Sequence, residues 1–256
     1  MTDYLPHERQ AAILRKLTED GRVLAADLAA LFETSEDTIR RDLREMAAQG
    51  VCRRVYGGAL PMDAPQPLSR RIDVAVDRKQ ALARRAAQLI EPGSSLFIDA
   101  GSSNLAIARD LPLDAGLTVI TNAPVIAAAL MDRRDIDVAL IGGSMDHKSG
   151  AILGAKAITE AGSYRTDICI LGSCGLDIET GVTASFLEEA EFKRAMARAS
   201  RSVIAAVTNE KLGCPAPFPV LGLSDRFTVV VEHDADDTVC AGLAGSGARF
   251  VKASSP

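Results

Sequence analysis

Hydrophobic residues in the first fifty positions recur at helical spacing and predict three short helices. The apolar positions repeat at intervals of three and four residues, which is typical of one buried face of a helix. They are Ile13, Leu14 and Leu17; Leu28, Leu31 and Phe32; and Ile39, Leu43 and Met46. The pair Thr34-Ser35 precedes the last stripe as a candidate N-cap, and Glu36 and Asp37 fill the first turn, where the helix dipole favours acids.

Arginine residues gather on the third predicted helix and just after it. Residues 38–56 contain five arginines and two acidic residues, whereas acidic residues outnumber basic ones over residues 1–37. At about 100° per residue, Arg41 and Arg44 project from the face opposite the apolar stripe, and Arg40 lies on its flank. These arginines fit a DNA-binding face, and they also fit an ordinary solvated helix face.

The segment after the third helix favours the DNA-binding interpretation. Residues 51–58 read VCRRVYGG, which predicts a short β-hairpin with Arg53 and Arg54 placed for contacts to phosphates. Three short helices and a basic hairpin are typical of a winged helix-turn-helix, in which the third helix enters the major groove. Guanidinium groups suit guanine edges and phosphates. We therefore predict that residues 1–60 form a domain that binds double-stranded DNA.

Two sequence motifs in this region resemble a known family. Residues 35–43 read SEDTIRRDL, and residues 57–59 read GGA. Both resemble the signature of DeoR-type bacterial transcriptional regulators, whose recognition helix carries TIRRDL and whose wing ends in GGA. Thr34 departs from the pattern, because the family usually has a small aliphatic residue there. The resemblance implies that operator DNA faces Ser35, Thr38, Arg40, Arg41 and Arg44.

Residues 61–76 and the following helix separate this region from a larger domain. Three prolines, at positions 61, 65 and 67, and the lack of a helical period predict a semi-rigid linker over residues 61–76. A helix is expected from about Asp77 to Glu91, because apolar residues recur there at helical spacing. We expect residues 77–256 to form an effector-sensing and oligomerisation domain.

Beyond Pro92, short apolar runs alternate with helical stretches and predict a parallel sheet. Apolar runs without alternation indicate strands that are covered on both faces. The predicted strands are Ser95–Ile98, Leu117–Thr121, Asp137–Ile141, Ile168–Leu171, Val203–Val207 and Phe227–Val231. Helices are expected to begin near Asn104, Pro124, Gly154, Leu187 and Asp236. The predicted fold class is therefore α/β, with an N-terminal winged helix-turn-helix joined to a larger parallel-sheet domain.

Four glycine-containing or polar loops follow predicted strands, where parallel sheets bind ligands. They are residues 99–104 (DAGSSN), 121–124 (TNAP), 142–144 (GGS) and 172–175 (GSCG). In the first loop, glycine permits close approach, serines offer hydroxyls, and a helix N-terminus favours an anion such as phosphate. Lys193 and Lys211 are candidate cations for the same crevice. Each loop alone also fits an ordinary turn, but together they predict a pocket for a polar ligand.

This half also resembles the DeoR family, through its sugar-phosphate-sensing domain, so the resemblance covers essentially the whole chain. That domain is related to the ribose-5-phosphate isomerase and CoA-transferase folds, and family members commonly repress catabolic genes until a phosphorylated sugar or a related metabolite binds. Transferred position by position, the effector-site candidates are Asp99, Gly101, Ser102, Ser103, Thr121, Asn122, Gly142, Gly143, Gly175 and Lys193. Asn104, from the first loop, and Lys211, a candidate cation of the crevice, complete the expected effector site.

Two departures from the family pattern concern the expected effector site. The usual GTT is Gly101-Ser102-Ser103 here, which keeps the hydroxyls and loses methyl contacts. The usual Asp-x-Ser-Lys is Thr208-Asn209-Glu210-Lys211, which keeps only the lysine and places Glu210 near the expected anion.

Two other functions remain open. A sugar-phosphate isomerase with a DNA-binding appendage needs acidic residues as proton-transfer bases in the segment 167–177. That segment reads DICILGSCGLD, with Cys174 and Gly175 where the acidic pair would stand. A constitutive architectural DNA binder would not need a sheet domain with these loops. We therefore expect a regulator rather than an enzyme, and the resemblance implies a repressor of a carbohydrate-catabolism operon.

Composition limits the cofactors and partners. The 256 residues are 47% apolar and 25% charged, which is typical of globular proteins, and the net charge of −5 gives no overall basic bias. The five cysteines and three histidines lack metal-site spacing, and no apolar run approaches the ~18 residues of a membrane helix. We expect a cytoplasmic protein without metal, cofactor or membrane partner. Because one winged helix contacts few base pairs, a homo-oligomer (dimer or tetramer) is also expected.

Overall fold

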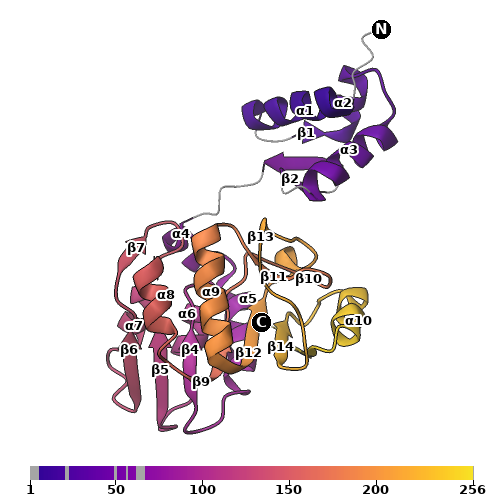
Figure 1. Ribbon diagram of the computed structural model, residues 1–256. Coiled ribbons are helices and arrows are strands. Elements are labelled where there is room, and N and C mark those ends of the chain that lie inside the picture. Colours follow the sequence, from indigo (N-terminus) through magenta and orange to yellow (C-terminus); the bar gives the residue numbers. More distant parts are fainter. Residues whose placement is uncertain (1–5, 21–22, 49–50, 56, 62–66, 256) are drawn as a thin grey trace. The chain divides into compact units, whose positions relative to one another are not determined.

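The computed structural model describes residues 6–20, 23–48, 51–55, 57–61 and 67–255. The chain divides into two compact units, residues 1–64 and residues 65–256, and Figure 1 labels most of their elements. Two glycines at which helices were expected to end, Gly21 and Gly50, lie outside the described residues.

The first unit contains the three predicted helices and a small antiparallel sheet. Its described elements are α1 (Pro6–Asp20), β1 (Val23–Leu24), α2 (Ala25–Leu31), α3 (Glu36–Ala48), β2 (Cys52–Val55) and β3 (Gly58–Pro61). The strands pair in the order β1-β3-β2. The two-residue strand β1 was not predicted, because two residues are too few for a pattern. The hairpin β2–β3 is the predicted wing.

Two residues assigned to the apolar stripes of this unit are exposed. Leu14 is 40% exposed and Leu31 is 56% exposed, whereas Ile13, Leu17 and Leu28 are buried. The prediction for Leu14 and Leu31 is therefore wrong. The helix α2 has only seven residues, and its buried face consists of Ala25, Leu28 and Ala29. This buried face is narrower than the predicted apolar stripe, and Leu31 lies outside it.

The second unit is built on a seven-stranded parallel sheet with the order β15-β14-β12-β9-β4-β5-β6. Its strands are β4 (Ser95–Ile98), β5 (Leu117–Thr121), β6 (Ile136–Leu140), β9 (Thr166–Ile170), β12 (Ser200–Val207), β14 (Phe227–Val231) and β15 (Arg249–Lys252). Smaller antiparallel elements are the hairpin β7 (Ser144–Asp146) and β8 (Ala151–Leu153), and the sheet of β10 (Gly175–Asp177), β11 (Gly181–Ala184) and β13 (Phe218–Leu221).

Helices cover both faces of the large sheet. One face packs on α5 (Val76–Ala87), α6 (Ser102–Arg109) and α7 (Pro124–Ala129). The other packs on α8 (Ala155–Ala161), α9 (Leu187–Ala199) and α10 (Asp237–Gly245). Figure 1 shows α8 and α9 in front of the sheet. Each predicted helix start in this unit is within two residues of an observed one. None of the described helices combines the length and the apolar character needed to cross a bilayer.

The sequence-based prediction differs from the structure mainly in the short elements. The strands β4, β5 and β14 have the predicted bounds, and the predicted strand 137–141 is shifted by one residue. The edge strand β15, the hairpin strands β7 and β8, and the small-sheet strands β10, β11 and β13 were missed because each has only three or four residues. The predicted helix over 77–91 runs from Val76 to Ala87.

The segment expected to be a linker contains a helix. Residues Leu68–Ile72 form α4, and residues 62–66 lie outside the described residues. The Leu68 side chain is buried, and its backbone N–H donates to the carbonyl of Lys148 over 3.0 Å. The helix thus depends on a contact with the β7–β8 hairpin, which no pattern over residues 61–76 contains.

The order in which the chain adds strands to the sheet changes sides between β4 and β9, although all the strands run parallel. From β4 the chain adds β5 and β6 on one side, and it then returns to place β9 on the other side of β4. Such a reversal leaves a crevice at the carboxyl ends of the two strands, where α/β sheets bind ligands.

Candidate functional site

The helix α3 separates a buried apolar face from an exposed basic face. Ile39, Leu43 and Met46 are buried, whereas Arg40, Arg41 and Arg44 are exposed. The arrangement follows the predicted helical wheel.

Two of these arginines are held by acidic side chains of the same helix. Arg40 donates to Glu36 over 2.6 Å, and Arg41 donates to Glu45 over 3.2 Å. The side chain of Arg41 is 77% exposed. Because exposed ion pairs contribute little free energy, phosphates or base edges can replace these acidic partners.

Ser35 and Thr38 lie together at the start of α3. The Ser35 hydroxyl accepts a hydrogen bond from the backbone N–H of Thr38 over 3.2 Å, and the two hydroxyl oxygens are 2.9 Å apart. Ser35 thus caps the helix as predicted. Arg53 and Arg54 are exposed on β2 of the wing.

A partly buried ion pair connects α1 to α3. Arg9 donates through Nε and Nη2 to the Asp42 carboxylate over 2.5 and 3.2 Å, and the Asp42 side chain is only 4% exposed. No local sequence pattern indicates a role for Asp42, because its partner lies 33 residues away on another helix. The pair positions the helix that presents the arginines.

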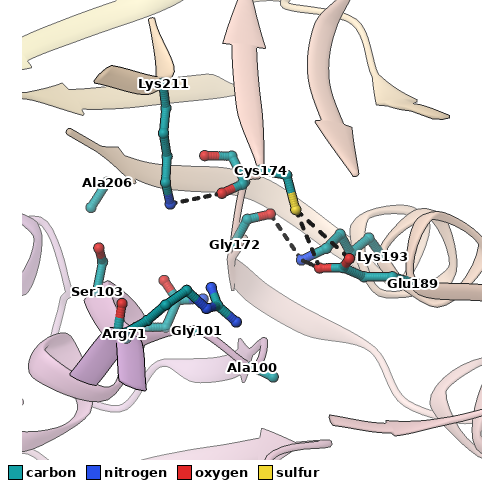
Figure 2. A pocket seen from close by; sticks show the side chains of 13 residues that line it. Arg71, Ala100, Gly101, Ser103, Gly172, Cys174, Glu189, Lys193, Ala206 and Lys211 are labelled. Atoms are coloured by element: carbon teal, nitrogen blue, oxygen red, sulfur yellow. Dashed lines mark hydrogen bonds and ion pairs between the residues drawn. The ribbon is translucent and has the colours of Figure 1, made fainter. Parts of the chain in front are cut away.

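A pocket lies at the carboxyl ends of β4, β9 and β12, beside the reversal point of the sheet. It is lined by Arg71, Ala100, Gly101, Ser102, Ser103, Asn104, Gly172, Ser173, Cys174, Glu189, Lys193, Ala206 and Lys211. Figure 2 shows Arg71 and Lys211 reaching into it from opposite sides. The pocket therefore combines the loop 101–104, at the start of α6, with the loop 172–174 and cations from three other elements.

A buried charge cluster forms one wall. The Lys193 ammonium binds the Asp99 carboxylate, the Gly172 carbonyl over 3.0 Å and the Glu189 carboxylate over 3.2 Å. Burial by itself would lower the pKa of Lys193, but the two carboxylates outweigh it and raise the pKa above the usual lysine range. Lys193 thus stays charged, and it is committed to Asp99 and Glu189.

The opposite wall has groups that are suited to an anion. The Lys211 ammonium donates to the Ser173 carbonyl over 2.9 Å. The Ser173 hydroxyl is buried, with the residue 9% exposed, and it has no hydrogen-bond partner among the described residues. The first N–H groups of α6, at Ser102 and Ser103, have no partner within a helix. Buried polar groups without partners are uncommon, so the arrangement favours a polar ligand.

Several predicted effector residues lie outside the pocket lining and hold the fold. The Thr121 hydroxyl donates to the Ile98 carbonyl over 2.6 Å, and the Asn122 amide donates to the Ile152 carbonyl over 3.3 Å. Gly142 donates to Glu160 over 3.1 Å. Gly143 and Gly175 lie where an added Cβ would overlap neighbouring atoms. Asp99 lies behind the pocket wall, on Lys193.

The pocket also contains residues that the sequence analysis did not select. Arg71 comes from the segment taken as a linker, and Ser173 and Cys174 come from a loop whose only selected residue was Gly175. Glu189 lies one helical turn before Lys193, and the Cys174 thiol donates to it over 3.7–3.8 Å. The acid–base spacing in α9 was the available sequence signal for Glu189.

Three acidic residues named for the expected anion site or for the isomerase alternative, Glu210, Asp167 and Asp177, do not line the pocket. The Glu210 carboxylate pairs with Arg78 over 2.8 Å. Asp167 accepts from Ser95 at the amino end of β9, and Asp177 accepts from the turn that follows it. Among the described residues, no cluster of His, Cys, Asp or Glu could hold a metal ion.

Comparison with known families matches both units. The DeoR-like helix-turn-helix domain matches residues 9–64, and the DeoR C terminal sensor domain matches residues 74–233. The glycerol-3-phosphate regulon repressor of Escherichia coli K12 is 33% identical over 208 residues, covering 80% of this chain and 82% of the relative. The repressor GlcR of Bacillus subtilis is 29% identical over 247 residues, covering 95% of both chains.

Solved structures give weaker similarities. The sorbitol operon regulator SorC from Klebsiella pneumoniae has a TM-score of 0.43 at 14% identity, covering 92% of this chain and 98% of its own. Ribose 5-phosphate isomerase A from Methanocaldococcus jannaschii has a TM-score of 0.39 at 15% identity, covering 53% and 54%. Similarities at this level carry no functional information.

Proposed function

Because the chain belongs to the DeoR family of transcriptional regulators, we propose that it represses a carbohydrate-catabolism operon until a phosphorylated metabolite binds. The pocket beside β4 and β9 is the effector site of this proposal. The observation that carries it is the buried Ser173 hydroxyl, which has no hydrogen-bond partner in the described part of the chain and lines the pocket with Lys211 and the N-terminus of α6. These groups suit a phosphate and neighbouring sugar hydroxyls.

The exposed basic face of α3 supports major-groove binding. We expect Arg41→Ala and Arg44→Ala to weaken binding to a duplex that the wild-type protein selects from random-sequence DNA. Each loss is about 1–3 kcal/mol for an arginine that reads a base, measured at fixed salt. Arg109→Ala, which removes an exposed arginine of α6, is the control. Unchanged affinity of the double variant would reject α3 as the recognition helix.

Cys174 offers a direct readout of pocket occupancy. Cys174 lines the pocket and Cys214 is exposed outside its lining, whereas Cys52, Cys169 and Cys240 are buried, which raises their thiol pKa values. Iodoacetamide should therefore label Cys174 and Cys214, since it reacts with accessible thiolates. We expect a phosphorylated effector, found by a screen of sugar and polyol phosphates, to slow the labelling of Cys174 only.

The same compound should release the protein from the selected duplex. Its unphosphorylated counterpart serves as the control. Because it lacks the anion, it should neither slow the labelling of Cys174 nor release the protein from the duplex. Cys214 is the internal standard for reagent and folding in each digest, read by mass spectrometry. If no phosphorylated compound in the screen protects Cys174 or raises the melting temperature, the proposed effector class is wrong.

A further inference from the structure

The helix α4 is the first element of the sensor unit after residues 62–66, which follow the wing. Its start is anchored through Leu68 to the β7–β8 hairpin, where Leu68 packs on Gly150. Its end carries Arg71, whose side chain lines the pocket and whose carbonyl accepts from the Lys79 ammonium over 2.5 Å. A single short helix therefore joins the pocket to the chain segment that leads to the DNA-binding unit.

Positive charges from three elements meet beside this helix. Arg71 comes from α4, Lys79 from α5 and Lys211 from the 3₁₀ turn Asn209–Lys211. Burial lowers the pKa of Lys79, and the charges of Lys211 and Arg71 lower it further. The nearby Glu210 carboxylate is engaged by Arg78. An anion between Arg71 and Lys211 would relieve this mutual repulsion.

The space in the pocket gives α4 a second role. The free space in the pocket measures about 20 Å³, room for roughly one water molecule. Hydrogen bonds of 3.0 Å, from Gly172 N–H to Asp99 and from Cys174 N–H to the Thr183 carbonyl, hold the strand-end loops. Arg71 is a long side chain on the five-residue helix α4, and it lines the same pocket. A ligand larger than a water molecule needs the pocket to widen, either on the side of Arg71 or on the side of these loops.

We infer that Arg71 and Lys211 together bind the anionic group of the effector, and that α4 moves with Arg71 and transmits occupancy to the connecting segment. The inference rests on the proposed function and adds to it the residue that couples the two units. A ligand shifts DNA affinity only if it favours one conformation over another, and α4 is the element whose position the ligand changes.

The test uses the full chain and inorganic phosphate as the probe. Hydrogen–deuterium exchange of residues 67–75 is followed by mass spectrometry with and without phosphate, and phosphate affinity is measured by calorimetry. We expect phosphate to change exchange over residues 67–75 in the wild type. Arg71→Ala should abolish that change and weaken phosphate binding by about 10-fold or more, as expected for a charge-assisted contact.

Two further variants keep the test decisive. Arg70→Ala removes the neighbouring exposed arginine of the same helix and should behave as the wild type. Arg71→Gln keeps a long polar side chain, so a loss in both Arg71 variants with unchanged melting temperature excludes a folding defect. Phosphate binding to Arg71→Ala as tight as to the wild type would reject the role of Arg71, and so would unchanged exchange of α4 in the wild type. Either result would leave the proposal that the pocket is the effector site intact. If neither phosphate nor any sugar phosphate binds the wild type, the proposed function itself fails.

Discussion

Lys193 illustrates how a single buried charge holds the pocket wall. Its ammonium pairs with Asp99 and Glu189 in a region where the side chains of Lys193 and Asp99 are 2% and 3% exposed. Breaking a buried ion pair leaves an uncompensated charge and costs about 3–5 kcal/mol. Lys193 therefore acts first on stability, whatever it also contributes to ligand binding.

Replacing this lysine should make stability depend on pH. In the wild type the pKa of Lys193 is raised, so its stabilisation is complete below the unfolded lysine pKa of about 10.4 and is lost only at higher pH. In Lys193→Met, burial still raises the pKa of Asp99, and the ammonium no longer opposes it. The folded variant then binds a proton that the unfolded chain releases, so its free energy of unfolding rises as pH falls from 8 to 5.

Urea unfolding at pH 8 and pH 5 measures this effect. We expect Lys193→Met to lose about 3–5 kcal/mol at pH 8 and less at pH 5. Arg198→Met, at an exposed position of the same helix, should match the wild type at both values. If Lys193→Met unfolded at pH 8 at the same urea concentration as the wild type, the stabilising role assigned to this ion pair would be wrong.

At the scale of elements, the wing depends on two glycines with different requirements. Gly57 has a φ of +80° and open space around it, whereas a Cβ on Gly58 would lie 2.0 Å from the Val23 carbonyl oxygen of β1. Gly57 thus permits a left-handed turn, and Gly58 permits close approach of β3 to β1. The GGA motif follows from the geometry of this hairpin.

Alanine at these two positions should have different consequences. Gly57→Ala adopts a left-handed conformation at a cost of about 1–2 kcal/mol and keeps the strands paired. Gly58→Ala forces two backbones apart, so we expect it to lose the β1–β3 pairing and the DNA affinity. Hydrogen–deuterium exchange of residues 23–25 and 57–61 distinguishes them. Equal protection of β1 and β3 in both variants would disprove the close-approach argument.

At the scale of the molecule, we propose a symmetric assembly held by the sensor unit. One α3 helix reads few base pairs, and two copies can read half-sites about 34–36 Å apart. We expect at least a dimer in light scattering at micromolar concentration, and the same mass for Gly58→Ala, since its change is confined to the first unit. A monomeric wild type would contradict this proposal.

The sequence alone contained enough information for the elements that repeat a pattern. The apolar stripe of α3 and the buried runs of β4 and β5 could be predicted, because burial on one face or on both leaves a periodic trace. The arginine face of α3 follows from the same periodicity. The segment of Leu68–Ile72 and the strand β15 could not be predicted, because their order depends on contacts with distant residues.

The predicted site shows the same division. The sequence by itself determined the loop 101–104 at the start of a helix, the lysines at 193 and 211, and the family to which the chain belongs. Only the tertiary structure decided that Lys193 is bound by Asp99 from 94 residues away, that Arg71 enters the pocket, and that Thr121 and Asn122 donate to backbone carbonyls. Local patterns specify which residues are available, but strand order decides which of them meet, since β4 and β9 become neighbours only when the sheet forms.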